Sequence, residues 1–180
     1  YGPYGWLEDY DPDWTPNTTD ANGRRYRFGQ QSPIAQWNLL QLAEAIYPLI
    51  NDVKPLEASL QKYSEVYQQG WTKMTAAKLG FGQSSGQTEQ LHSGLEHILQ
   101  MIETDMTLFY RALSEFELTH HGELESTALK ECFSKAWYQS DQVDEKYLKV
   151  LSNWLTEYAR AVKEAGVDEE TALVHFNLAP

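Results

Sequence analysis

Apolar side chains recur every three to four residues along this 180-residue chain, from Ile34 to Phe176. That spacing places them on one face of an α-helix, and no long segment alternates apolar and polar residues as a half-buried strand does. The sequence therefore predicts an all-α fold, in which a helical bundle-like domain follows a long ordered loop. The residues that mark the predicted helices lie within 33–47, 55 to either 70 or 79, 91–102, 108–116, 124–136, 147–162 and 168–176.

Residues that typically begin and end helices support these boundaries. Ser32 followed by Pro33 is typical of a capped helix start, and Pro48 is expected to end the same helix at Tyr47. The glycine-rich stretch 80–86 predicts a connector. Gly166 predicts the end of the sixth helix, so the last short helix is expected to begin at Asp168.

The residues before the first helix have a different composition. They are rich in Gly, Pro and Asp, which favour turns, but also in Tyr and Trp, which disordered tails lack. An ordered loop of roughly thirty residues exceeds the usual connection length, and such loops are usually functional. We expect Trp6 and Trp14 to pack near Trp37, and Arg24 or Arg25 to bond to a carboxylate or a backbone carbonyl.

Four blocks of this opening segment, in order, resemble the selenoprotein O family, called YdiU in bacteria. The blocks are Tyr1-Gly-Pro-Tyr-Gly-Trp6, Asp11-Pro-Asp-Trp14, Thr19-Asp20 with Gly23 to Phe28, and Ala35-Gln-Trp-Asn-Leu39 through Ala43. Two departures from the family pattern stand out. Arg24-Arg25 adds a residue before Tyr26, and Thr15-Pro16-Asn17 replaces a segment in which many relatives carry a cysteine.

The resemblance implies that this chain is the carboxy-terminal helical half of a kinase-like protein adenylyltransferase. Residues 1–31 would form an activation-segment-like loop, and residues 32–180 a helical domain of a larger protein. The intact enzyme would use ATP with Mg or Mn to transfer AMP to Ser, Thr or Tyr hydroxyls of protein substrates. The chain by itself is expected to be inactive and to bind no cofactor.

The family's metal-binding Asp immediately precedes the residue that is Tyr1 here. No catalytic residue and no metal ligand is therefore expected in this chain, and the missing amino-terminal half is its expected partner. The residues expected near the rim of the active site are Tyr1, Gly2, Pro3, Gly5, Arg24, Arg25 and Tyr26. The competing interpretation is a non-enzymatic helical module that docks through its acidic face or its aromatic loop.

Three cations, Arg24, Arg25 and Arg27, stand together in the loop of an otherwise acidic chain. Two roles fit them equally: they hold a phosphate, or they pin the loop to acidic helices. The formal net charge of −12 argues against nucleic acid as a partner, because phosphate backbones require clustered Lys and Arg.

No apolar run reaches the roughly 18 residues of a membrane span, so no membrane partner is expected. Cys132 is the only cysteine, which excludes an internal disulfide and is typical of a reducing cytoplasm. Its place on an apolar helix face predicts a buried, inert thiol.

Two groups of side chains have the spacing of metal ligands. In the loop, the carboxylates of Asp9, Asp11, Asp13 and Asp20 match several positions of a calcium-binding loop. Trp14 stands where such a loop requires glycine, which argues against calcium. On the third helix, His92 and Glu96 share a face that is either a metal site or a solvated polar face. The sequence lacks a Glu-x-x-His partner helix, which favours the polar face.

His120-His121-Gly122 is typical of a capped helix end.

Overall fold

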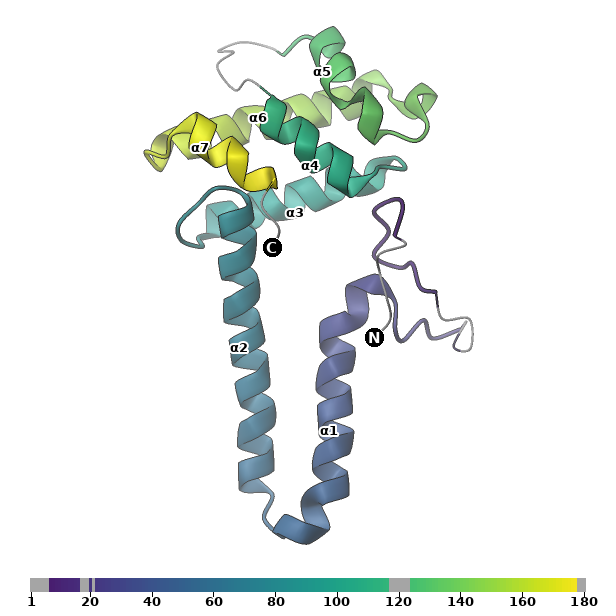
Figure 1. The fold of residues 1–180 in the computed structure, drawn as a ribbon, viewed down its shortest axis with the longest axis vertical. Coiled ribbons are helices and arrows are strands. Elements are labelled where there is room, and N and C mark those ends of the chain that lie inside the picture. The colour runs from purple at the N-terminus through teal and green to yellow at the C-terminus, as the bar shows by residue number, and fades with distance from the viewer. Residues whose placement is uncertain (1–6, 17–19, 21, 117–123, 178–180) are drawn as a thin grey trace. The chain divides into compact units, whose positions relative to one another are not determined.

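The computed structural model describes residues 7–16, 20, 22–116 and 124–177, and every regular element among them is helical (Figure 1). The only strand-like contact in this described part is an isolated bridge between Thr104 and Trp137. The predicted all-α class is therefore confirmed. The α-helices are α1 (Gln31–Ile50), α2 (Lys54–Lys78), α3 (Gly86–Met101), α4 (Met106–Glu115), α5 (Ser126–Phe133), α6 (Glu145–Glu164) and α7 (Glu169–Val174). Short 3-10 helices cover Phe28–Gln30, Ser134–Ala136, Ser140–Gln142 and His175–Asn177.

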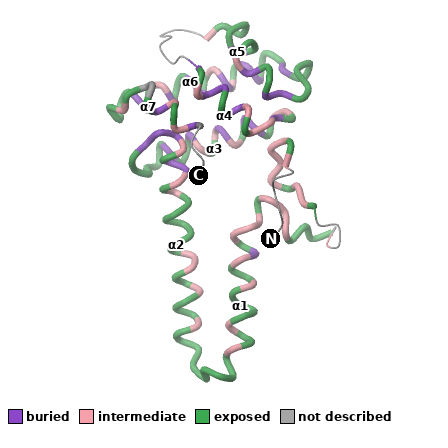
Figure 2. Tube along the Cα trace, in the orientation of Figure 1, coloured by how far each residue is buried: buried purple, intermediate pink, exposed green. Residues whose placement is uncertain are grey.

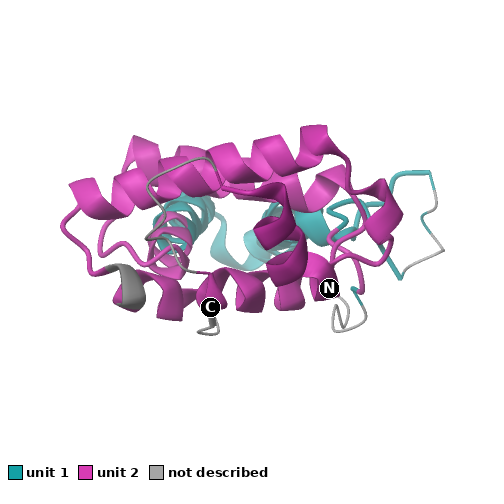
Figure 3. Ribbon diagram, turned by 90° about the horizontal axis from the view of Figure 1, so that it is seen from above, with its two compact units in different colours: residues 1–7, 11–71 teal, residues 8–10, 72–180 magenta. Residues whose placement is uncertain are grey.

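The chain divides into two compact units, which Figure 3 distinguishes by colour. The first comprises residues 1–7 and 11–71, and the second residues 8–10 and 72–180. The boundary falls within α2, between Trp71 and Thr72.

Both predicted ends of the first helix were wrong. The 3-10 turn Phe28–Gln30 runs directly into α1, so Ser32 lies inside the helix and does not cap it. Pro33 is tolerated there because the first backbone N–H groups of a helix have no partner within it. At the other end α1 continues through Pro48 and stops at Asn51, whose φ of 52° is left-handed and whose N–H donates to the Tyr47 carbonyl at 2.7 Å. Pro48 has no N–H, so it leaves the Glu44 carbonyl without the hydrogen bond that residue 48 of a regular helix would donate.

For the second helix, the longer of the two predicted alternatives is confirmed. α2 passes through Gly70 and ends at Lys78. An isolated glycine costs a helix about 1 kcal/mol, whereas continuing the helix buries Ala76 and leads to the fully buried Leu79. The five later helices lie where apolar residues marked them, with two differences. α3 begins at Gly86, the last residue of the predicted connector, and the fifth helix changes to a 3-10 turn after Phe133. His120-His121-Gly122 falls outside the described residues.

Side-chain caps fix where four of these helices begin. Ser85 and Thr88 form a reciprocal capping box at α3. The carboxylates of Asp105, Asp144 and Asp168 accept backbone N–H groups at the starts of α4, α6 and α7. The predicted start at Asp168 is therefore confirmed, and the caps of α3, α4 and α6 each stabilise their helix by about 1 kcal/mol.

The core of the second unit is organised around α6. Figure 2 shows buried residues concentrated in this unit. The polar ends of three large aromatic side chains are satisfied inside it: Tyr158 donates to the Leu79 carbonyl at 2.9 Å, Trp154 to the Leu91 carbonyl at 2.8 Å, and Trp137 to the Tyr147 hydroxyl at 3.0 Å. These bonds allow the core to bury tyrosine and tryptophan without an orphaned donor.

Buried tyrosines make the second unit sensitive to alkaline pH. Burial raises the pKa of Tyr110 and Tyr147 to about 12 and also raises the pKa of Tyr158. Above about pH 10 the unfolded chain loses these protons while the folded chain keeps them, so the free energy of unfolding must fall as pH rises. We expect a loss of up to about 1.4 kcal/mol per pH unit and per tyrosine. Urea denaturation midpoints measured from neutral to alkaline pH check this, and Tyr147→Phe is expected to weaken the dependence. A midpoint that stays constant above pH 10 would contradict it.

The first unit differs from the second in how it exposes apolar surface. All but two of the exposed large apolar side chains in the described part of the chain lie between Trp37 and Trp71; the exceptions are Tyr138 and Val174. In α1, only Ile34 of the predicted apolar series is buried. In α1 these side chains point to several sides of the helix, and we use the name apolar face of the first unit for the whole exposed set: Trp37, Leu39, Leu40, Leu42, Tyr47, Leu49, Ile50, Val53, Val66, Tyr67 and Trp71.

The sole cysteine is less buried than predicted. Cys132 is only half-buried, and its thiol lies 3.5 Å from the Ala112 carbonyl. Burial nevertheless raises its pKa, with a smaller contribution from Glu115. A raised pKa keeps the thiol protonated and unreactive, as predicted for an inert cysteine.

Candidate functional site

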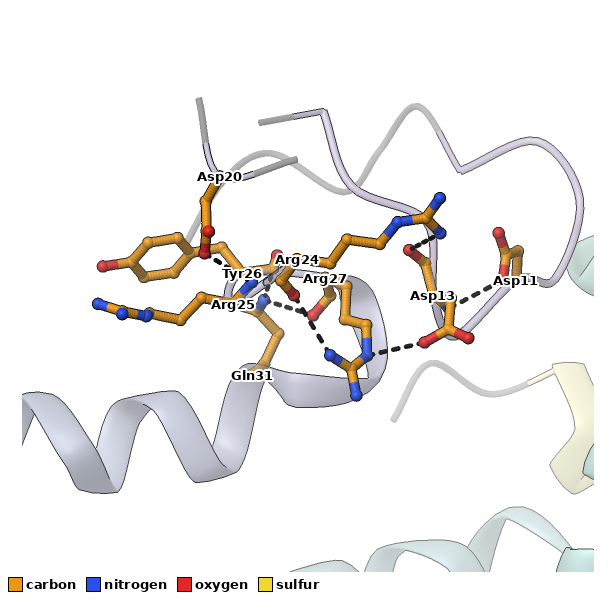
Figure 4. A network of polar contacts seen from close by, with 8 residues as sticks. All are labelled: Asp11, Asp13, Asp20, Arg24, Arg25, Tyr26, Arg27 and Gln31. Carbon is orange, nitrogen blue, oxygen red and sulfur yellow. Dashed lines mark hydrogen bonds and ion pairs between the residues drawn. The ribbon is translucent and has the colours of Figure 1, made fainter. Parts of the chain in front are cut away.

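The candidate site is the segment that carries the three arginines, together with the first turns of α1. We call residues 20 and 22–30 the arginine loop. It belongs to the first unit and packs against an earlier stretch of the same unit, residues 11–14 (Figure 4).

Asp13 is the point at which the two stretches are joined. The Arg27 Nε lies 2.7 Å from the Asp13 carboxylate, and Arg24 donates through Nη1 to the Asp13 backbone carbonyl at 3.4 Å (Figure 4). Asp13 is itself held, because its backbone N–H donates to the Asp11 carboxylate at 2.8 Å. Two of the three arginines are thus engaged in holding the loop closed.

Asp20 organises the turn that presents the arginines. Its backbone carbonyl accepts from the Arg24 N–H at 2.9 Å, and its carboxylate accepts from the Arg25 N–H at 3.1 Å. Arg24 adopts a left-handed φ of 40°, a conformation that side-chain-bearing residues rarely adopt. A side chain at Gly23 would come within 2.8 Å of the Asp20 carboxylate. The turn is therefore a defined conformation maintained by specific bonds.

The loop joins α1 without a break. Gln31 donates through its side-chain amide to the carbonyls of Tyr26 and Arg27, both at 3.0 Å. The Phe28 N–H donates to the Trp14 carbonyl, and Gly29 approaches Pro12 so closely that a Cβ atom would lie 3.1 Å from it. These contacts fix the direction in which the Arg25 side chain leaves the backbone.

A surface pocket of about 380 Å³ opens between the arginine loop and α1. Arg25 and Trp37 contribute to its lining, and the Arg25 guanidinium lies 4.9 Å from the centroid of the Trp37 ring. In Figure 4 the end of the Arg25 side chain points away from Asp13. No ion pair and no side-chain hydrogen bond joins the Arg25 guanidinium to another of the described residues. Arg27 also lines the pocket but is paired with Asp13, so Arg25 is the cation of this pocket that has no ion pair with a described residue. Its N–H donors suit the binding of an anion.

The structure gives a different outcome for Arg24 and Arg27 than for Arg25 when it is compared with the predicted roles. The expectation that Arg24 or Arg25 bonds to a carboxylate or backbone carbonyl is confirmed by Arg24. Arg24 and Arg27 pin the loop as predicted, but their partner is Asp13 in the same unit, and not an acidic helix. The helices were the wrong partner because Asp13, in a neighbouring stretch of the loop, supplies its carboxylate to Arg27 and its backbone carbonyl to Arg24.

Several predicted site residues cannot be placed. Tyr1, Gly2, Pro3 and Gly5 lie outside the described residues, as does Trp6. Tyr26 is half-buried and contributes its carbonyl to the bond with Gln31. Trp14 is half-buried, and its expected packing near Trp37 stays a prediction.

On α3 the structure brings His92 and Glu96 onto one face, with His92 Nδ1 3.6 Å from one oxygen of the Glu96 carboxylate. The other oxygen accepts from the Tyr10 hydroxyl at 2.9 Å, and the Tyr10 N–H donates to the Thr104 carbonyl. Burial, followed by the charge of Glu96, raises the pKa of Tyr10. The face is therefore the attachment point for residues 8–10, a role that sequence spacing does not reveal because 86 residues separate the partners.

Within the described part of the chain, no group of three or more His, Cys, Asp or Glu side chains is arranged to hold a metal ion. In the loop, Asp11, Asp13 and Asp20 each accept hydrogen bonds or pair with arginine from their own chain. No described helix has both the length and the apolar character needed to cross a membrane.

Comparisons with known proteins agree on one family. The family described as "Protein adenylyltransferase SelO" matches residues 1–177. Curated relatives called "Protein nucleotidyltransferase YdiU" include those of Rhodopirellula baltica, 46% identical over 175 residues, and Flavobacterium johnsoniae, 42% identical over 178 residues. These alignments cover 94% and 99% of this chain but only 32% and 33% of the relatives. The chain thus spans about a third of the length of the curated relatives it matches.

Proposed function

Because the chain belongs to the SelO family of protein adenylyltransferases, we propose that it is the carboxy-terminal helical part of an enzyme that transfers AMP from ATP to Ser, Thr or Tyr hydroxyls of other proteins. The observation that carries this proposal is the family match, which extends over residues 1–177. The protein substrates and the use of ATP are part of the proposal.

The proposal divides the work between this chain and the rest of the polypeptide. AMP transfer needs cations to neutralise phosphate charge and a group that positions the acceptor hydroxyl. The arginine loop offers one available arginine, and the described residues contain no cluster of metal-ligating side chains. We therefore assign ATP and the Mg or Mn ion to the rest of the polypeptide, and no step of the reaction to residues of this chain.

In this proposal residues 1–31 form an activation-segment-like loop beside the active site, and residues 32–180 form a helical domain of a kinase-like fold in a cytoplasmic protein. The loop's rim residues are those expected from the sequence: Tyr1, Gly2, Pro3, Gly5, Arg24, Arg25 and Tyr26. Support comes from the bonds to Asp13 and Asp20, which give the arginine loop the defined shape that a substrate-facing segment requires.

The apolar face of the first unit is proposed to pack against the rest of the polypeptide. It includes a series of stacked rings on α2, Tyr63 with Tyr67 and Tyr67 with Trp71, whose centroids lie 6.1 and 6.2 Å apart. Soluble proteins rarely leave so large an apolar set in water unless it contacts something else. Beyond the part that aligns with this chain, the curated relatives contain about twice as much polypeptide. That additional polypeptide is the proposed source of the contacting surface.

The same face favours one alternative, a non-enzymatic helical module that binds a separate protein. The two proposals differ in where the covering surface comes from. In the first it comes from the same polypeptide and accompanies AMP transfer, whereas in the second no AMP transfer occurs at all.

The test compares this chain with the whole polypeptide that the proposal assumes. The chain alone is expected to bind no ATP in calorimetry with magnesium or manganese and to label no protein with AMP, whereas the whole polypeptide does both. Micromolar ATP binding or metal-dependent labelling by the chain alone would overturn the assignment. A whole polypeptide that binds no ATP and labels no protein would favour the binding module.

A pair of variants tests the apolar face in the same preparations. Leu42→Glu, on the apolar face, is expected to leave the denaturation midpoint of the chain alone unchanged and to lower that of the whole polypeptide. Val174→Glu is the matched control, because Val174 is exposed in α7 outside this face and is expected to change neither midpoint. Equal effects of both variants on the whole polypeptide would contradict the proposed contact.

A further inference from the structure

We propose that the pocket between the arginine loop and α1 binds a carboxylate side chain of the protein substrate, with Arg25 as the residue that recognises it. This inference rests on the proposed function, because it names a substrate feature for the same transfer reaction. It assigns a preference for acidic residues near the modified hydroxyl.

The first argument is the availability of Arg25. Of the three arginines, Arg24 and Arg27 are engaged with Asp13, whereas the Arg25 guanidinium contacts only the ring of Trp37 among the described residues. The ring of Trp37 offers no carboxylate or carbonyl acceptor, and the guanidinium carries the paired N–H donors that match a carboxylate. Trp37 thus holds the cation in place without using the donors that a ligand needs.

The second argument is the backbone that supports Arg25. Its own N–H is fixed to the Asp20 carboxylate, and the preceding residue is held in a left-handed conformation. On the other side, Gln31 binds the carbonyls of Tyr26 and Arg27. A side chain that leaves such a turn loses less conformational entropy when it binds a ligand than one on a mobile loop.

The third argument is local charge. The whole chain carries a formal charge of −12, yet residues 20–43 contain three arginines and a single carboxylate, Asp20. Salt at physiological strength screens distant exposed charges beyond roughly 8 Å, so a ligand in the pocket experiences mainly the nearest charges. Among these, Arg27 is paired with Asp13, whereas the Arg25 guanidinium has no ion pair with a described residue.

The composition of the pocket favours a carboxylate over a phosphate. Phosphate groups carry up to two negative charges and are usually held by several cations. Here Arg25 and Arg27 both line the pocket, but Arg27 is paired with Asp13, and Asp20 contributes to the same lining. Since a single planar cation matches a single planar carboxylate, Glu or Asp of a substrate protein is the ligand that fits.

Direct binding tests the proposal without ATP. The probe is a fluorescent peptide with one serine flanked by glutamates, and a matched peptide carries glutamines in their place. The whole polypeptide is expected to bind the glutamate peptide more tightly, and Arg25→Gln to weaken that binding about tenfold, as expected for one charge-assisted hydrogen-bond pair. Arg25→Lys, which keeps the charge but not the planar fork, is expected to lose less. Arg160→Gln is the matched control, an exposed arginine of α6 whose loss is expected to change nothing.

Three outcomes would overturn the proposal. The first is equal binding of the glutamate and glutamine peptides, and the second is unchanged glutamate-peptide binding in Arg25→Gln. The third is that Arg25→Gln weakens binding of AMP or inorganic phosphate but not of the peptide, which would identify a phosphate site.

If the proposed AMP transfer does not occur, the result can be told apart from failure of the proposed role of Arg25. In that case the wild-type polypeptide transfers no AMP to either peptide, while the binding measurements still decide the role of Arg25. If transfer does occur, Arg25→Gln is expected to slow labelling of the glutamate peptide and to leave labelling of the glutamine peptide unchanged.

Discussion

Replacing Gly80 with alanine is expected to destabilise the second unit by about 2 to 5 kcal/mol. Gly80 has a φ of 81°, and a Cβ added to it would lie 2.7 Å from the Ala172 Cα and 2.9 Å from its carbonyl oxygen. Left-handed geometry costs an alanine about 1 to 2 kcal/mol, and overpacking a core adds about 1 to 3 kcal/mol. Backbone atoms of α7 cannot move aside as a flexible side chain does.

Gly80 is also where α2 ends in a Schellman motif. Its N–H donates to the Ala77 carbonyl, and the Phe81 N–H donates to the Ala76 carbonyl. Denaturant midpoints of three glycine variants separate the two costs. Gly166→Ala has a left-handed φ of 64° but open space, so we expect only the conformational cost, and Gly82→Ala has neither problem. If Gly80→Ala and Gly166→Ala lose equal stability, the close contact with Ala172 is wrong.

Replacing Trp154 with alanine is expected to cost about 3 to 5 kcal/mol of unfolding free energy, the range for truncating a buried large aromatic residue. The Trp154 ring is almost completely buried and stacks on Tyr158 with centroids 5.3 Å apart and planes 3° apart. Its indole N–H donates to the Leu91 carbonyl, and Gly94 provides the space for the ring edge, since a Cβ there would lie 3.0 Å from it.

Two variants calibrate this expectation in urea denaturation. Trp154→Phe keeps a stacking ring but loses the hydrogen bond, so we expect a loss of about 1 to 2 kcal/mol. Trp71→Ala removes the same side chain from an exposed position of α2 and is expected to cost less than Trp154→Ala. Similar losses for the two alanine variants would show that Trp154 does not anchor the core of the second unit.

Helix positions in the second unit could be predicted from the sequence because their signals are local. The apolar spacing on α6 and the start at Asp168 depend on residues within a few positions of each other, and the structure has both. The first helix was harder, because Ser32-Pro33 and Pro48 are typical helix boundaries that the structure places inside α1. A preceding 3-10 turn and a left-handed Asn51 decided those ends. Asn commonly takes the left-handed position after a helix, so Asn51 was a local signal that the interpretation of Pro48 overrode.

The amino-acid sequence by itself determined the all-α class and the family, because helical periodicity and ordered motif blocks are properties of neighbouring residues. It also located the arginines of the candidate site. Only the tertiary structure decided which of them is available, since Arg24 and Arg27 are engaged by Asp13, more than ten residues away, and Arg25 lies against Trp37. The pairing of Tyr10 with Glu96 likewise joins residues 86 positions apart. Contacts of this kind depend on how the backbone folds back on itself, which local side-chain patterns do not specify.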